Sequence, residues 1–285
     1  MQPFEYARPH SLQEAAELLH SHTDDAAVLA GGTDLIVQMQ KGVRTPAVVI
    51  DLKHVVELDA DIEPDDGRLR VGAKACLADI ESHPEVRKRF PALAEAVGVI
   101  GSVQIRNRAT LVGNICNASP AADTAPPLLV YEARVNVFGP EGRHAVPMDH
   151  FFAGPGRTVL GLGELVESVD LPLPNEANGS AFHRLARRRG MDLASVSVAC
   201  CLNASGHLRL AFGAAGPTPI LVTDQARVFL EEGPCRAAEE RLDELARNAQ
   251  PISDVRAGED YRRAMVCVLS HRCLRTARRR MEDSE

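Results

Sequence analysis

The chain of 285 residues is 45% hydrophobic and 25% charged, enough apolar material to bury one large core or two to three modest ones. Its formal net charge is −7, from 39 acidic and 32 basic residues, so it has no basic surplus with which to bind nucleic acid. No run reaches the roughly 18 apolar residues that span a bilayer, and the start lacks a signal-like pattern, so we expect a cytoplasmic protein without a membrane span.

The first part of the chain predicts a strand, a turn and a helix around a pair of glycines. Ser11 stands where it can cap a first helix. The spacing of apolar residues after it indicates two short strands and a second helix. We expect helices over 12–19 and 35–40, strands over 26–30 and 47–52, and a glycine turn over 31–34.

The middle of the chain predicts further strands, two helices and one hairpin. Pro91 is tolerated because it falls in the first turn of the second of these helices. Two strand-like runs flank Gly139 to Gly142, which is typical of a hairpin. We expect strands over 69–73, 134–138, 144–148 and 164–171, and helices over 77–83 and 91–99.

A cluster of proline, asparagine and glycine over 172–179 indicates a domain boundary. After it we expect a basic stretch from Arg184 to Arg189, two strands over 196–202 and 208–212, and two helices. The remainder of the chain therefore predicts a small α+β unit. Its charged last segment, 277–285, is expected to fray at its end.

Two glycine-bearing segments are the candidates for binding chemistry. They are Ala30 to Asp34 and Thr110 to Asn114, and we expect each to lie at the end of a strand. Glycine permits a positive φ, and successive bare amides form a concave anion site, so two such turns that converge could hold a diphosphate. Taken alone, Gly31-Gly32 is more often a tight turn capped by Thr33 or Asp34.

Other kinds of chemistry find little support in the sequence. No G-x-G-x-x-G follows a strand, which argues against a Rossmann dinucleotide site. The seven cysteines include no C-x-x-C pair and the ten histidines show no H-x-x-x-H spacing, so we predict no metal site and no catalytic residue on this chain. Taken alone, Asp123 is more often a helix or turn cap, and the run Arg187 to Arg189 is more often a solvated face than a docking patch.

Five segments, taken in chain order, form a specific pattern: LAGGTDLIVQM, VVIDLKHVVEL, LRVGAKACLADIE, QIRNRATLVGNICNASPAADTAPPLL and GELVESVDLPLP. They closely resemble the FAD-binding subunit of the molybdenum hydroxylases, the family of xanthine dehydrogenase and carbon monoxide dehydrogenase. Phe182, Arg188 and Asp192 resemble the opening of that family's C-terminal domain. Arg184 stands where a lysine is usual, which keeps the charge but changes its geometry. The resemblance covers essentially the whole chain.

The resemblance implies an α+β fold in three parts. It predicts a two-part FAD-binding domain of the vanillyl-alcohol oxidase / p-cresol methylhydroxylase type over 1–176, divided at about residue 55. A small α+β C-terminal domain over 177–285 is expected to follow it.

The resemblance also implies a function in electron transfer, within a multi-subunit molybdenum hydroxylase that is either xanthine dehydrogenase-like or an N-heterocycle or purine dehydrogenase. We expect FAD on this chain, [2Fe–2S] clusters on a small partner subunit and a molybdopterin cofactor on a large partner subunit, assembled as a dimer of heterotrimers. The flavin would take electrons from the clusters and pass them to NAD+ or another acceptor. The alternatives are a self-contained flavin-dependent oxidase or dehydrogenase of the same fold class, and a non-catalytic scaffold subunit.

The family's cofactor contacts map onto fourteen residues of this chain. The diphosphate would lie between the two glycine-bearing segments, where Thr33 and Thr110 can donate hydroxyl hydrogen bonds. Asp123 would bind the ribityl chain, and aliphatic side chains would contact the flavin rings. The predicted cofactor-binding residues are Leu29, Ala30, Gly31, Gly32, Thr33, Asp34, Leu35, Ile100, Thr110, Gly113, Asn114, Asp123, Leu165 and Arg184.

Overall fold

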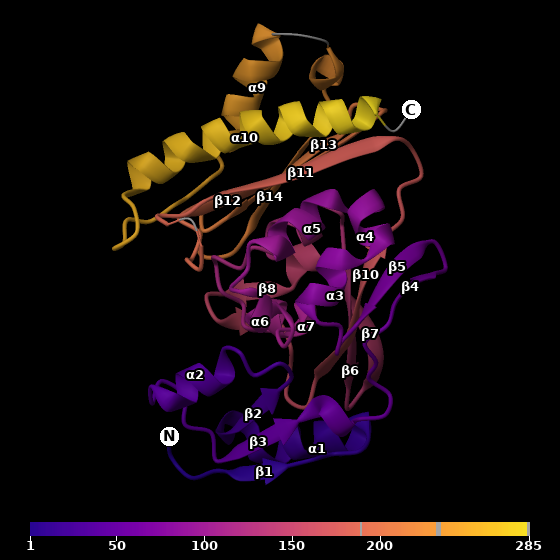
Figure 1. Cartoon of the computed structure of the whole chain (residues 1–285), viewed down its shortest axis with the longest axis vertical. Helices are drawn as coiled ribbons and strands as arrows, with labels where there is room; N and C mark the ends of the chain where they lie inside the picture. The colour runs from indigo at the N-terminus through magenta and orange to yellow at the C-terminus, as the bar shows by residue number, and fades with distance from the viewer. Residues whose placement is uncertain (189, 232–234, 284–285) are drawn as a thin grey trace.

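The computed structural model describes residues 1–188, 190–231 and 235–283, which form three successive sheets with helices packed around them (Figure 1). The N-terminal sheet is parallel, with strand order β1-β3-β2. Ser11 caps the first helix as expected, because its hydroxyl accepts a hydrogen bond from the Glu14 amide at 3.1 Å. The elements of this part are β1 (Glu5–Ala7), α1 (Leu12–His22), β2 (Ala26–Leu29), α2 (Leu35–Gln40) and β3 (Val48–Asp51).

The middle sheet is antiparallel, with strand order β4-β5-β10-β6-β7, and shares one continuous apolar core with the helices beside it. Its strands are β4 (Ile62–Asp65), β5 (Arg68–Gly72), β6 (Arg134–Gly139), β7 (Gly142–Pro147) and β10 (Leu165–Pro172). The helices are α3 (Leu77–Ser82), α4 (Pro84–Arg89), α5 (Pro91–Gly98), α6 (Val103–Arg106), α7 (Leu111–Cys116) and α8 (Ala125–Val130). A small two-stranded ribbon, β8 (Phe152–Gly154) with β9 (Arg157–Thr158), precedes β10.

The last sheet is an antiparallel meander of β11 (Asn178–Leu185), β12 (Val196–Asn203), β13 (Leu208–Gly213) and β14 (Ile220–Asp224). The long helix α10 (Glu259–Glu282) lies along this sheet and contacts β11 and β12, and α9 (Arg236–Ala246) packs beside α10 (Figure 1). Helices α5 and α8 of the middle part contact the same sheet. The C-terminal sheet is therefore covered both by its own helices and by the part of the chain that precedes it.

The predicted elements of the first two parts are present, but the start of the last part differs from expectation. Residues 178–185 form the strand β11 where the sequence suggested a boundary followed by a basic stretch. Gly179 looked like a loop residue, yet a Cβ on it would lie 1.8 Å from the Ala277 carbonyl oxygen, so glycine is required here for α10 to pack on the strand. Arg189, Ser284 and Glu285, which belong to the predicted basic stretch and frayed end, lie outside the described residues.

Tyr131 joins the middle part of the chain to the C-terminal sheet. Its hydroxyl accepts a hydrogen bond from the Ala92 amide at 3.1 Å and shares another with Ser180 on β11. The ring meets Phe90 edge-on, with centroids 5.0 Å apart. All of these groups are buried, so the hydroxyl satisfies two polar groups that water cannot reach.

Tyr131→Phe is expected to lower the free energy of unfolding by about 1–3 kcal/mol, because it leaves the Ala92 amide and the Ser180 hydroxyl without this partner. Urea titration of the variant against wild type measures the change. Tyr261→Phe is the matched control, since Tyr261 is 54% exposed. Equal stability of the two variants would contradict the role given to the Tyr131 hydroxyl.

Candidate functional site

The first glycine turn joins the end of β2 to the start of α2 and leaves backbone donors free. Gly32 has a φ of +74°, the left-handed conformation that glycine adopts without steric cost. Within the described residues, none of the amides of Gly31, Gly32 and Thr33 donates a hydrogen bond. Three successive amides are thus available to an anionic ligand, as the sequence predicted for this turn.

The second glycine-bearing segment is the start of a helix, so the prediction that it lies at a strand end is wrong. It follows α6, and the Thr110 hydroxyl caps α7 by accepting a hydrogen bond from the Gly113 amide at 2.9 Å. Gly113 and Asn114 therefore lie inside α7. The error arose because a short apolar run such as Leu111-Val112 fits a strand and a buried helix equally well. The hydrogen of the Thr110 hydroxyl is still available to donate.

The two segments meet in space although about eighty residues separate them. A Cβ on Gly31 would lie 2.0 Å from the Arg108 carbonyl oxygen and 2.9 Å from the Ala109 Cα. The first turn thus packs directly on the backbone that leads into Thr110. Further on, the Thr124 hydroxyl donates to Asn114 Oδ1 at 2.6 Å, which ties α7 to the loop that carries Asp123.

Asp123 is 6% exposed and has one paired and one unpaired oxygen. Its Oδ2 accepts a hydrogen bond from Arg184 Nη1 on β11 at 2.7 Å, whereas its Oδ1 is buried without any partner. Burial raises the pKa of the Asp123 carboxyl to about 6, and the opposing effect of Arg184 does not cancel it. An orphaned buried acceptor is costly, and a hydrogen-bond donor on a bound ligand would satisfy it.

The remaining predicted residues frame this site less directly. Leu29 and Leu35 flank the first turn and are buried, whereas Asp34 is exposed and accepts a hydrogen bond from the side chain of Gln38. Arg106 of α6 donates to the Ile100 carbonyl at 3.1 Å, so Ile100 is tied to the helix before the second segment. Leu165 is 3% exposed and begins β10, the strand that α7 contacts.

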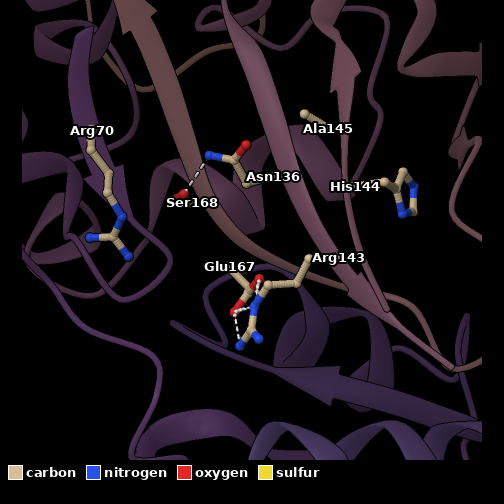
Figure 2. A pocket seen from close by; sticks show the side chains of 7 residues that line it. All are labelled: Arg70, Asn136, Arg143, His144, Ala145, Glu167 and Ser168. Atoms are coloured by element: carbon tan, nitrogen blue, oxygen red, sulfur yellow. Dashed lines mark hydrogen bonds and ion pairs between the residues drawn. The ribbon is translucent and has the colours of Figure 1, made fainter. Parts of the chain in front are cut away.

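Two cavities among the described residues differ in their relation to this site. One of about 490 Å³ lies on the middle sheet and contains none of the predicted residues. Figure 2 shows Arg143 of this cavity in an ion pair with Glu167. Arg70 pairs with Asp59, so both arginines of this cavity already have carboxylate partners. The other, of about 600 Å³, is lined by Arg184 together with Val99 and His183, whose pKa burial lowers. It therefore adjoins the site from the side of β11.

The sequence indicates Asp123 and Arg184 separately but not their ion pair, which joins residues 61 positions apart. The contact between Gly31 and Arg108 was also not predicted residue by residue. No local pattern could have given either pairing, because both depend on the tertiary fold.

The described part of the chain contains neither a membrane-spanning helix nor a cluster of metal-ligating side chains. No described helix is long and apolar enough to cross a membrane. Among the same residues, no three His, Cys, Asp or Glu side chains gather where they could hold a metal ion.

Solved structures share this fold along nearly the whole chain. Carbon monoxide dehydrogenase from Hydrogenophaga pseudoflava, in a form that lacks the Mo-pyranopterin moiety, gives a TM-score of 0.89 at 32% identity and covers 98% of this chain and 99% of that chain. Quinoline 2-oxidoreductase from Pseudomonas putida 86 gives a TM-score of 0.85 at 25% identity, over 99% and 98%. These likenesses indicate the class of the chain, which is a subunit of an oxidoreductase.

Sequence comparisons identify the family. The chain matches the FAD binding domain in molybdopterin dehydrogenase over residues 2–174 and the CO dehydrogenase flavoprotein C-terminal domain over residues 180–277. It is 32% identical to the xanthine dehydrogenase FAD-binding subunit of Escherichia coli O157:H7 over 95% of both chains, and 32% identical to the carbon monoxide dehydrogenase medium chain of H. pseudoflava over 96% of both. The chain belongs to the FAD-binding subunits of the molybdenum hydroxylases, which confirms the resemblance, the fold class and the oxidoreductase assignment.

Proposed function

We propose that this chain binds FAD between its two glycine-bearing segments and Asp123, and that it serves as the electron exit of a molybdenum hydroxylase. The observation that carries the proposal is the unpaired, buried Oδ1 of Asp123, on a loop tied to Asn114 of the second segment. The first turn, whose amides are free, packs on the backbone that leads into that segment. A diphosphate needs several donors, and a sugar-like chain offers hydroxyls to a carboxylate. The residues present fit both parts of FAD.

In this proposal each of the fourteen residues has a definite place. Residues 29–35 face the diphosphate from one side, and Thr110, Gly113 and Asn114 face it from the other. Asp123 Oδ1 accepts a hydrogen bond from a ribityl hydroxyl, while Arg184 holds the other carboxylate oxygen. Ile100 and Leu165 contribute apolar contacts to the flavin rings. Bound FAD supplies redox chemistry, because it accepts electrons singly and releases them as a pair.

We further propose partners and an acceptor for this subunit. Electrons would arrive from [2Fe–2S] clusters in a small subunit, next to a large subunit with molybdopterin, and would leave to NAD+ or another acceptor. The relatives support this, since one is the medium chain of carbon monoxide dehydrogenase and another the FAD-binding subunit of xanthine dehydrogenase. A dimer of heterotrimers, and domains over 1–176 and 177–285, complete the proposal.

Purification from the native host under mild conditions tests the proposal. We expect the chain to be yellow, with the absorption spectrum of an oxidised flavin, and to co-purify with an iron–sulfur subunit and a molybdenum subunit. Substrate of the complex should bleach the flavin only when both partners are present. A lone yellow chain that oxidises a small molecule would favour the self-contained oxidase, and a colourless chain that takes up no FAD would favour the scaffold.

A further inference from the structure

The loop that carries Asp123 is held from outside by two backbone hydrogen bonds. The Gly156 amide donates to the Ala118 carbonyl at 2.9 Å, and the Ala214 amide donates to the Pro120 carbonyl at 2.7 Å. Within the loop, Ser119 accepts a hydrogen bond from the Ala121 amide through its hydroxyl and another from the Ala122 amide through its carbonyl. This tight turn links Pro120 to Asp123, so a shift of Pro120 would displace the carboxylate.

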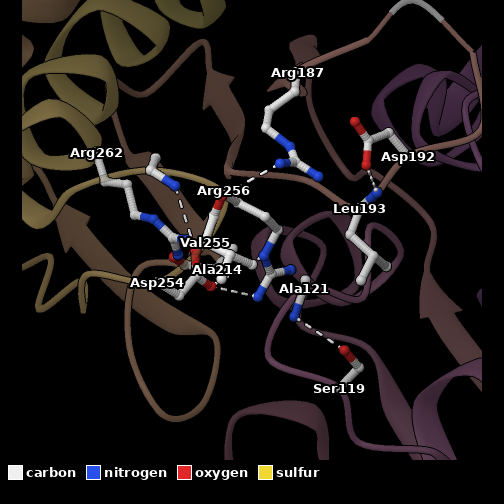
Figure 3. A network of polar contacts seen from close by, with 11 residues as sticks. Ser119, Ala121, Arg187, Asp192, Leu193, Ala214, Asp254, Val255, Arg256 and Arg262 are labelled. Carbon is white, nitrogen blue, oxygen red and sulfur yellow. Dashed lines mark hydrogen bonds and ion pairs between the residues drawn. The ribbon is translucent and has the colours of Figure 1, made fainter.

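Ala214 belongs to the C-terminal part of the chain, where it follows β13. It is 6% exposed and has a φ of +54°, a conformation that a residue with a Cβ keeps only when its surroundings impose it. The surroundings are visible in Figure 3, where Arg262 of α10 reaches Ala214. Arg262 Nη1 donates to the Ala214 carbonyl at 3.2 Å, and the Arg262 residue is only 2% exposed.

Arg262 is itself anchored by Asp254. Its Nη2 donates to Asp254 Oδ1, and Arg256 donates to Asp254 Oδ2 through Nε at 3.0 Å and Nη2 at 2.7 Å. Desolvation alone would raise the pKa of Asp254, but the hydrogen bonds from Arg256 and Arg262 hold it well below its usual range. The carboxylate thus stays charged and fixes the guanidinium that holds Ala214.

We infer that Arg262 is a positioning residue for the flavin site, which it reaches through Ala214 and Pro120 to set the place of Asp123. The inference rests on the proposed role of Asp123 and adds a contact from the C-terminal part that touches no cofactor. Arg184 holds the Asp123 side chain, whereas the Arg262–Ala214–Pro120 relay holds the backbone of its loop. The first restraint comes from β11, the first element of the C-terminal part in the sequence, and the second comes from α10, its last helix.

Arg262→Gln in the full chain tests the relay. We expect the dissociation constant for FAD, measured by quenching of flavin fluorescence, to rise about tenfold, which corresponds to one lost hydrogen bond of a charged group. Amide hydrogen exchange should accelerate at Ala214 and in residues 118–123 even without FAD. Arg262→Lys should recover part of both effects, because an ammonium can reach one of the two acceptors.

Two control variants separate positioning from loss of stability. Arg263→Gln changes the neighbouring arginine, which is exposed and pairs with Glu259 and Asp260, and should leave FAD affinity unchanged. Leu274→Ala opens a cavity beneath α10 and should lower the Tm while leaving FAD affinity unchanged. If Arg262→Gln does not fold, Asp254→Asn weakens the same anchor and should give the same two effects.

Three results would overturn the inference. One is wild-type FAD affinity in Arg262→Gln although the exchange of Ala214 is faster. Another is a loss of FAD affinity in Leu274→Ala as large as that in Arg262→Gln, when the two variants have the same Tm. The third is amide hydrogen exchange of residues 118–123 in FAD-free Arg262→Gln that equals that of wild type. Arg262 would then not hold this loop, whether or not FAD binds. Failure of wild type itself to bind FAD would instead reject the proposed function.

Discussion

Gly31→Ala is expected to abolish retention of FAD while the chain stays folded. The added Cβ would lie 2.0 Å from the Arg108 carbonyl oxygen, 2.7 Å from its carbon and 2.9 Å from the Ala109 Cα. All three are backbone atoms, so no flexible side chain can give way and the two glycine-bearing segments must separate. A ligand held by amides from both segments would lose about a hundredfold or more in affinity, equivalent to about 3 kcal/mol. Flavin absorbance after gel filtration, with far-ultraviolet circular dichroism, measures both expectations.

Gly42→Ala is the matched control for this variant. Gly42 follows α2 with a φ of +69°, and a Cβ on it would meet nothing within 4 Å. The substitution should cost about 1 kcal/mol of stability through its backbone and leave FAD binding intact. Full flavin content in Gly31→Ala would show that contact between the segments is not needed for binding.

Gly32→Asp probes the same turn by charge. Gly32 has a φ of +74°, and the new carboxylate would stand beside the amides proposed to meet the diphosphate. Repulsion between anions adds to the backbone cost, so this variant should also lose flavin. Retained flavin in Gly32→Asp would move the diphosphate away from this turn.

The sequence predicts most of the local structure because its signals are local. Ser11, the Gly31-Gly32 pair and the hairpin turn at Gly139 each act through residues within a few positions, and the structure has a helix, a turn and a hairpin at these places. Gly179 and Gly113 show the limit of such signals. Both look like loop glycines, but one is required by the approach of α10 and the other lies inside α7.

The candidate site could be predicted only as separate pieces. Glycine chemistry indicates the two glycine-bearing segments and the family pattern indicates Asp123, but their arrangement depends on contacts over long sequence separations. Ala214 and Arg262 carried no signal at all, since neither lies near a motif. A buried arginine that holds a left-handed alanine becomes visible only when α10 is placed on the sheet.

Asp123 should make FAD binding depend on pH in the mildly acidic range. Without ligand its pKa is raised to about 6, so most of the carboxyl is ionised at pH 7 and protonated at pH 5. A ribityl hydroxyl donates best to the ionised form, so FAD affinity should fall about tenfold from pH 7 to pH 5. Titrations of the chain with FAD at several pH values measure this profile.

The same group should affect the stability of the FAD-free chain in the opposite direction. Its folded pKa is raised above the unfolded value of 3.8, so its contribution to stability is fully present below that value and is lost as the pH rises through about 6. The FAD-free chain should therefore lose stability from Asp123 over the range in which its affinity for FAD increases. FAD affinity and the stability of the FAD-free chain should therefore change in opposite directions with pH. This distinguishes Asp123 from a group that ionises only because the fold is lost.

Asp123→Asn should remove both slopes and weaken FAD binding about tenfold at pH 7, because an amide is a poorer acceptor and leaves Arg184 without its counter-ion. Asp65→Asn is the control, since Asp65 is an exposed aspartate of β4 outside the proposed site, and both slopes should persist in it. If the slopes survive in Asp123→Asn, a different group titrates, and the orphaned oxygen of Asp123 is then not the acceptor for the cofactor. Loss of both slopes only in Asp123→Asn would tie the pH dependence to the buried Asp123 carboxylate, which Arg184 and the Pro120 loop hold in place.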